Sequence, residues 1–127
     1  MLVDCYSLKM KVNQTEQQIQ KSIVKYLRHE LPRAIINHSR NEGNRGGKRG
    51  MIDGVRGKLM GVCAGYPDIV IHDQGETFFI EVKREKSYLT KTQREVRSNL
   101  IGQGYKYCIA RSNQDVESFI STLRGED

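Results

Sequence analysis

Residues 67–83 read PDIVIHDQGETFFIEVK, and this stretch predicts the β-hairpin around which the other elements are arranged. Asp68–His72 and Thr77–Lys83 are both rich in β-branched and aromatic residues, which favour extended strands. Gln74-Gly75 lies between them and suits a two-residue turn, because Gly readily adopts the positive φ that such a turn requires. The stretch therefore predicts two antiparallel strands with a defined pairing register.

The predicted turn determines which residues face each other across the hairpin. Three opposed pairs follow from it: Asp73 with Glu76, Ile71 with Phe78, and Asp68 with Glu81. Lys83 lies two residues after Glu81 and therefore shares its face of the sheet. The opposite face carries the apolar side chains that supply the core: Ile69, Ile71, Phe78, Ile80 and Val82. A slip of one residue would exchange the two faces and bury all three charges, which the core would resist.

Asp68, Glu81 and Lys83 together suggest the hydrolysis of a phosphodiester. Two carboxylates opposed on neighbouring strands repel each other, and a divalent cation between them removes that repulsion. Such an ion polarises a phosphoryl oxygen and lowers the pKa of a coordinated water, while Lys83 adds a compact positive charge. A turn-forming Pro-Asp and a solvated strand face of alternating charge account for the same residues without catalysis, so both interpretations stay open.

The rest of the chain predicts helices and strands on both sides of the hairpin. In order, the elements are a helix from Thr15 to Pro32, a strand over Ala34–His38, the hairpin, a helix from Thr90 to Gly102, a strand over Tyr105–Arg111 and a helix capped by Ser112. The apolar face of the second helix is formed by Leu89, Gln93, Val96 and Leu100. This order predicts an α/β fold in a single domain over residues 1–127. Residues 1–13 are expected to form an N-terminal arm or edge strand, and residues 51–60 a short helical turn.

Composition limits the kinds of partner and the compartment. The net charge of +6 favours a polyanion such as nucleic acid, although ordinary solubility charge also accounts for it. No apolar run approaches the roughly 20 residues of a membrane span, and the N-terminus lacks a signal-peptide pattern, so we expect a cytoplasmic protein without a membrane partner. The cysteines Cys5, Cys63 and Cys108 are too scattered for a disulfide framework or a zinc site. The three histidines also lack zinc-site spacing and are expected at the surface or partly buried.

Residues 40–50 read RNEGNRGGKRG and predict a flexible basic loop. The glycine–lysine spacing is one residue short of a phosphate-binding loop, and Arg49 stands where that loop needs Ser or Thr, which excludes nucleotide binding. Contact with a DNA backbone through Arg45, Lys48 and Arg49 is the functional interpretation, and a plain solvated loop is the alternative.

Pro67-Asp68 followed by Glu81-Val82-Lys83 resembles the PD-(D/E)xK nuclease superfamily and, more narrowly, its VRR-type nuclease family. The similarity runs from Thr15 to Ala110. It includes five further segments: Glu16, Asn41-Glu42-Gly43, Gly61–Tyr66, Leu89–Gln93 and Gly104-Tyr105.

The resemblance implies a restriction-endonuclease-like core, with a mixed central sheet flanked by helices. It implies Mg²⁺ or Mn²⁺ as the cofactor. The implied catalytic residues are Asp68, Glu81, Lys83, Glu16 and Gln93, and the implied metal ligands are Asp68, Glu81, the carbonyl of Val82, and Glu16. Lys83 would orient or activate the attacking water, and Glu16 would act directly or through water. A purely structural role stays open for two of these residues, because Glu16 suits the positive end of its helix and Gln93 closes a capping box.

The resemblance also implies an activity. Small standalone members of the family are associated with viral, including phage, or bacterial genomes. They resemble homodimeric enzymes that cut branched DNA such as four-way (Holliday) junctions. This implies a structure-selective, metal-dependent DNA endonuclease whose basic loop, together with Asn41, contacts the DNA. The alternatives are a nucleic-acid-binding module without catalysis and an accessory protein of replication or recombination. Tyr66 and Tyr88 flank the predicted site; base stacking is one interpretation of each, and packing at the core or rim is favoured.

Overall fold

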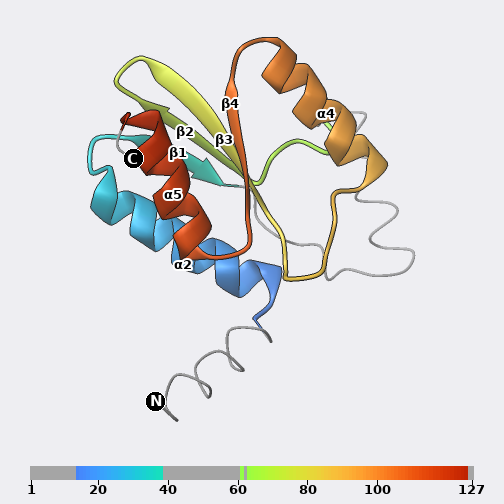
Figure 1. The fold of residues 1–127 in the computed structure, drawn as a ribbon, viewed down its shortest axis with the longest axis horizontal. Helices are drawn as coiled ribbons and strands as arrows, with labels where there is room; N and C mark the ends of the chain where they lie inside the picture. The colour runs from blue at the N-terminus through green and yellow to red at the C-terminus, as the bar shows by residue number, and fades with distance from the viewer. Residues whose placement is uncertain (1–13, 39–60, 62, 126–127) are drawn as a thin grey trace.

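A computed structural model describes residues 14–38, 61 and 63–125 of the chain (Figure 1). Its elements are α2 (Glu16–Glu30), β1 (Ile35–His38), β2 (Ile69–Asp73), β3 (Glu76–Val82), α4 (Lys91–Gly102), β4 (Lys106–Ala110) and α5 (Asn113–Leu123). The α/β class and the order of elements predicted from the sequence are confirmed. The predicted arm over 1–13, the basic loop over 40–50 and the helical turn over 51–60 lie outside the described residues.

The four strands form one mixed sheet in the order β1-β2-β3-β4. β1, β2 and β3 are antiparallel neighbours, whereas β4 is parallel to β3, and α4 forms the connection between them. The predicted hairpin register is confirmed by the pairs Asp73–Glu76, Ile71–Phe78 and Ile69–Ile80. Gln74 and Gly75 have φ values of 50° and 81°, the positive values of a type I′ turn.

The main core lies between the sheet and the pair α2 and α5. Figure 1 shows these two helices side by side on one flank of the sheet, with α4 beyond β4 on the other. The fully buried side chains of this core include Ile23, Leu27, Ile69, Ile80 and Val116. The sheet residues among them alternate along the strands, as predicted, because successive side chains of a strand point to opposite faces. No helix in the described part of the chain is long and apolar enough to cross a membrane.

The second face of the sheet is also covered, which differs from the solvated strand face that the sequence left as an alternative. Glu81 and Lys83 are only 1% and 7% exposed. Phe79, on the same face, packs edge-on against the rings of Tyr66 and Tyr105 at centroid distances of 5.9 and 5.4 Å. The strand pattern predicts which residues share a face, but it does not predict what lies over that face.

The apolar face predicted for α4 is only half-buried. Val96 and Leu100 have intermediate exposure, and no side chain of the helix is fully covered. The physical reason is that α4 packs against β4, the edge strand of the sheet, and makes no comparable contact with another helix or strand in the described part of the chain.

Candidate active site

Asp68 and Glu81 meet at the open end of the β2–β3 hairpin, one pair beyond Ile69 and Ile80. The backbone N–H of Asp68 donates a hydrogen bond to Oε2 of Glu81 at 3.2 Å. The N–H of Val82 donates to Oδ2 of Asp68 at 2.9 Å. Each carboxylate is therefore held by the backbone of the opposite strand, and the strand pairing continues through the two acidic side chains.

Burial beside a second acid raises the pKa of Glu81 from 4.5 to about 8. Burial is the largest cause, followed by the negative charge of Asp68 and a hydrogen bond between the two carboxyl groups. The positive charge of Lys83 and the N–H of Asp68 act in the opposite direction. Without a cation the pair is therefore most stable when it retains a proton, and a divalent ion could replace that proton.

Gln93 connects this pair of acids to α4. Its Nε2 donates a hydrogen bond to Oε1 of Glu81 at 2.7 Å. Its Oε1 accepts from the N–H of Thr90 at 2.9 Å, and its own N–H donates to the Thr90 hydroxyl at 3.2 Å. The capping box and the contact with the site, which the sequence left as two interpretations of Gln93, are both present. One amide group thus begins the helix and orients the acid.

Gly65 allows the segment before Asp68 to lie directly on the first turn of α4. Its φ is +79°, and a Cβ at this position would lie 2.7 Å from the carbonyl oxygen of Thr92 and 2.9 Å from the backbone nitrogen of Gln93. Those are backbone atoms, which cannot rotate away as a side chain can. The close approach therefore requires glycine here.

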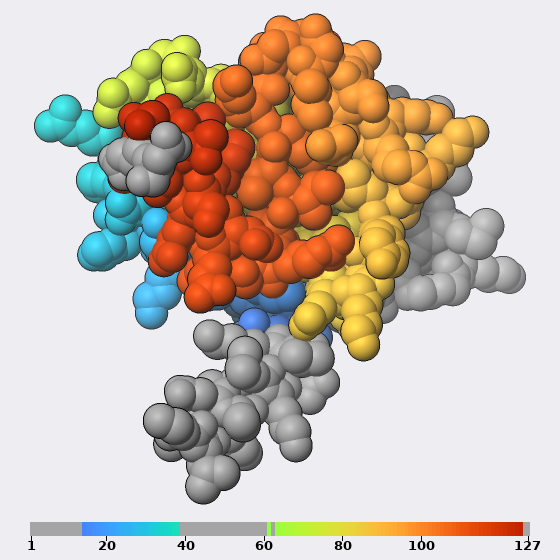
Figure 2. All heavy atoms as spheres, viewed as in Figure 1, coloured from blue at the N-terminus to red at the C-terminus, as the bar shows by residue number. Residues whose placement is uncertain are grey.

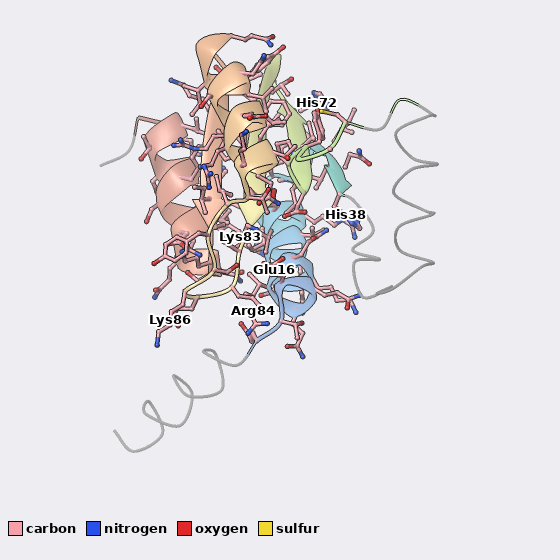
Figure 3. All side chains as sticks on the ribbon, turned by 90° about the vertical axis from the view of Figure 1, so that its right-hand side faces the viewer. Glu16, His38, His72, Lys83, Arg84 and Lys86 are labelled. Atoms are coloured by element: carbon pink, nitrogen blue, oxygen red, sulfur yellow. The ribbon has the colours of Figure 1, made fainter. Side chains whose placement is uncertain are left out.

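Lys83 directly follows β3, and its N–H donates to the carbonyl of Ala110 at the end of β4, at 3.0 Å. Its ammonium is close enough to Glu81 to lower the pKa of that acid, so the three predicted residues share one electrostatic environment. Figure 3 shows Lys83 on the same side of the molecule as Glu16, whereas His72 lies at the far end. The three histidines, His29, His38 and His72, are exposed, as predicted.

Glu16 is the first residue of α2 and is half-buried. Within the described ranges, no group of three or more His, Cys, Asp or Glu side chains could hold a metal ion. Glu16 therefore does not complete a three-residue ligand cluster with Asp68 and Glu81, and its action through water stays a prediction. Asn41, Arg45, Lys48 and Arg49, the predicted DNA contacts, lie outside the described residues.

The donor set nevertheless fits a hard divalent ion. Asp68 and Glu81 bring carboxylate oxygens together, and the carbonyl of Val82, whose N–H bonds to Asp68, would add a third oxygen. Mg²⁺ is typically held by one or two carboxylates and keeps several waters, so it does not need a cage made only of protein ligands. The pair of acids, in which the pKa of Glu81 is raised, has the charge and the atom type for this ion.

Two residues near the acids were not found from the sequence. Tyr107 pairs with Phe79, and its pKa is raised by burial and then by the negative charge of Glu81. Arg97 lies one helical turn after Gln93, with its guanidinium carbon 5.6 Å from the centre of the Tyr107 ring. The sequence shows that Tyr105, Tyr107 and Ile109 alternate along one strand. The parallel pairing of β3 and β4 brings Tyr107 close to Glu81, and the sequence does not predict that pairing.

Both the sequence and the fold are similar to those of known proteins. Residues 5–114 match the model of the VRR-NUC domain family. A solved structure described as a VRR_NUC domain protein is 24% identical, covers 91% of this chain and 93% of its own, and superposes with a TM-score of 0.66, a likeness of fold. No curated protein matches. With most of its length matched, the chain belongs to the VRR-NUC family of the restriction-endonuclease-like nucleases, a family with a nuclease-type function.

Proposed function

We propose that the protein is a divalent-metal-dependent DNA endonuclease with its reaction centre at Asp68, Glu81 and Lys83. The observation that carries the proposal is the contact between two carboxyl groups beside a lysine that is only 7% exposed. Burying Glu81 and Lys83 beside the half-buried Asp68 is unfavourable for stability alone, because a buried charge loses its hydration. Perturbed titratable groups of this kind gather at reaction centres.

Mg²⁺ or Mn²⁺ is the proposed cofactor, with Asp68, Glu81 and the carbonyl of Val82 as the residues that would hold it. When bound, such an ion polarises a phosphoryl oxygen and lowers the pKa of a water ligand. Glu16, at the start of α2, is proposed to contribute through a water molecule. These residues suit a divalent cation because they provide oxygen ligands and because Asp68 and Glu81 carry negative charge.

The residues of the chain have separate tasks in this proposal. Lys83 presents a positive charge from a buried position, where it is less screened than at the surface, and it stabilises the developing negative charge or orients the attacking water. Gln93 fixes the orientation of Glu81 through the 2.7 Å hydrogen bond. The backbone N–H of Val82 holds Asp68 in the same way. The site is therefore pre-organised by its own strands and by α4.

Branched DNA, such as a four-way junction, is the proposed substrate, and a homodimer is the proposed active form. A two-fold axis would present two reaction centres to two strands of a junction. The net charge of +6 supports binding to a nucleic-acid backbone, with Asn41, Arg45, Lys48 and Arg49 as proposed contacts.

Cleavage of a DNA panel tests the proposal. Linear duplex, single-stranded, splayed and four-way substrates would be incubated with the purified protein and Mg²⁺, Mn²⁺ or EDTA. We expect metal-dependent cleavage that favours the branched members. Asp68→Asn removes one charge of the pair and should abolish cleavage.

Asp73→Asn is the matched control, because it makes the same chemical change at the other end of β2, next to the hairpin turn. It should cut like the parent. Equal cleavage by Asp68→Asn and the parent would remove the proposed reaction centre. Equal cleavage of every substrate would remove the branched-DNA preference and leave the nuclease.

A further inference from the structure

Residues 84–89 connect Lys83 to α4, and two arginines hold the segment in place. Arg111, just after β4, donates from Nη1 to the carbonyls of Arg84 at 2.8 Å and Ser87 at 2.7 Å. Arg94 donates from Nη1 to the carbonyl of Leu89 at 2.8 Å. Both ends of the segment are therefore supported by guanidinium groups from outside it.

The segment contains a tight turn with an unusual backbone. The N–H of Ser87 donates to the carbonyl of Arg84 at 3.1 Å, which closes the turn. Lys86, within it, has a φ of 66°, in the left-handed region that residues other than glycine rarely adopt. Conformations of this kind persist where surrounding contacts enforce them, and they gather at functional sites. The hydrogen bonds from Arg111 and Arg94 to the segment are such a set of contacts.

Tyr88 is presented to solvent by this turn. Its side chain is 79% exposed, so the favoured prediction of packing at the core or rim is wrong for this residue. Tyr66, at 46%, and Tyr105, at 39%, instead rest edge-on against Phe79. The only ring contact of Tyr88 among the described residues is the guanidinium of Arg111, whose central carbon is 5.9 Å from the ring centre. A braced segment thus holds an aromatic ring in the open.

The surroundings of the ring are mainly cationic. Arg84 and Lys86 are exposed on the segment, Arg111 lies beside the ring, and Glu85 is the one acid within residues 84–89. Figure 3 shows Arg84 and Lys86 on the same side of the molecule as Lys83. In Figure 2 the segment, in yellow, reaches the surface between α5 in red and α4 in light orange. The ring is therefore accessible to solvent on a segment that begins directly after Lys83.

We propose that Tyr88 is a stacking platform for an unpaired DNA base next to the phosphate at Lys83. This inference rests on the proposed nuclease function and deepens it, because it specifies a substrate with a single-stranded nucleotide beside the cut. An aromatic face accepts any base, and neighbouring cations hold the backbone, which is the combination used by proteins that bind single strands. The contact with Arg111 orients the ring and adds its own attraction for a base.

Binding measured in EDTA separates this inference from catalysis. The probe is a short DNA strand carrying 2-aminopurine, whose fluorescence is quenched when the base stacks, at the unpaired position of a splayed duplex. We expect quenching with the parent and with Tyr88→Phe, which keeps the ring. Tyr88→Leu keeps an apolar side chain without a π face. It should lose the quenching and bind about five- to a hundredfold more weakly.

Two controls make the result specific. Ile35→Ala changes another large exposed apolar side chain, 68% exposed on β1, and should bind like the parent. On a fully paired duplex, Tyr88→Leu should also bind like the parent, because no base is free to stack. Arg111→Met removes the guanidinium that donates to the carbonyls of Arg84 and Ser87, and it should reduce the quenching.

The two proposals fail in different ways. Undiminished quenching with Tyr88→Leu, or an equal loss of affinity on paired duplex, would overturn the stacking platform while metal-dependent cleavage by the parent still supported the nuclease. Asp68→Asn should quench like the parent and cut nothing. A parent that quenches the probe but cuts no DNA would remove the nuclease and leave Tyr88 as a base-binding residue.

Discussion

Gly65→Ala should destabilise the protein because it adds an atom between two backbone segments. The added Cβ would lie 2.7 Å from the carbonyl oxygen of Thr92 and 2.9 Å from the nitrogen of Gln93, with the glycine at φ +79°. An L-residue in the left-handed region costs about 1–2 kcal/mol. Overpacking against atoms that cannot rotate away adds about 1–3 kcal/mol. The expected loss of unfolding free energy is therefore about 2–5 kcal/mol.

Gly75→Ala separates the two contributions. Gly75 has nearly the same φ, +81°, but a Cβ there would meet no atom within 4 Å. This variant should lose only the contribution from backbone conformation, about 1–2 kcal/mol, less the small gain from a stiffer unfolded chain. The difference between the two variants, about 1–3 kcal/mol, measures the contact with α4.

Urea unfolding followed by circular dichroism provides the two free energies. Cleavage of branched DNA provides a second measurement, because displacement of the Gln93 backbone also displaces the amide that holds Glu81. We expect cleavage to fall in Gly65→Ala and not in Gly75→Ala. If the two variants unfold within about 0.5 kcal/mol of each other, the contact between Gly65 and α4 does not position the site.

Three further predictions concern the acids and their neighbours. Gln93→Glu keeps an acceptor for the helix cap but replaces the amide donor with a third negative charge. Urea unfolding in EDTA at pH 8 should therefore show a free energy of unfolding that is lower by about 1–3 kcal/mol. An unchanged unfolding midpoint would contradict the role of the amide. The pKa of Glu81 is higher in the folded protein, about 8, than its ordinary value of 4.5, so the folded state binds the proton more tightly. In EDTA, the contribution of protonated Glu81 to the free energy of unfolding should be fully present below pH 4.5 and lost as the pH rises through 8. Glu81→Gln should flatten this pH dependence, and a parallel decline in both proteins would refute the assignment. Lys83→Met removes the ammonium and keeps a four-atom apolar chain at a side chain that is only 7% exposed, so the protein should fold while single-turnover cleavage falls at least about a hundredfold; a smaller loss would exclude Lys83 from the chemistry.

The hairpin register was predictable because it depends on local signals. A two-residue turn at Gln74-Gly75 and the alternation of the strands fix the pairing, and with it the meeting of Asp68 and Glu81. The capping box of Thr90 and Gln93 is likewise a pattern of four residues. Local signals therefore define which side chains face each other within one supersecondary unit.

Features that depend on distant segments were not predictable. The parallel pairing of β4 with β3 brings Tyr107 beside the acids, but no residue of either strand specifies that neighbour. Burial of Lys83 depends on what covers the second face, which alternation does not describe. The bonds of Arg111 to carbonyls 24 and 27 residues earlier have no local signature either.

The hydrogen bonds of Arg111 also determine when the turn at residues 84–89 becomes ordered as the chain is synthesised. The turn that carries Tyr88 leaves the ribosome before the arginine that supports it, and β4 must join the sheet before that arginine is in position. We expect nascent chains that end before β4 to hold the turn only loosely. The stacking platform at Tyr88 would then be completed only after β4 has been made, when β2 and β3 have already paired.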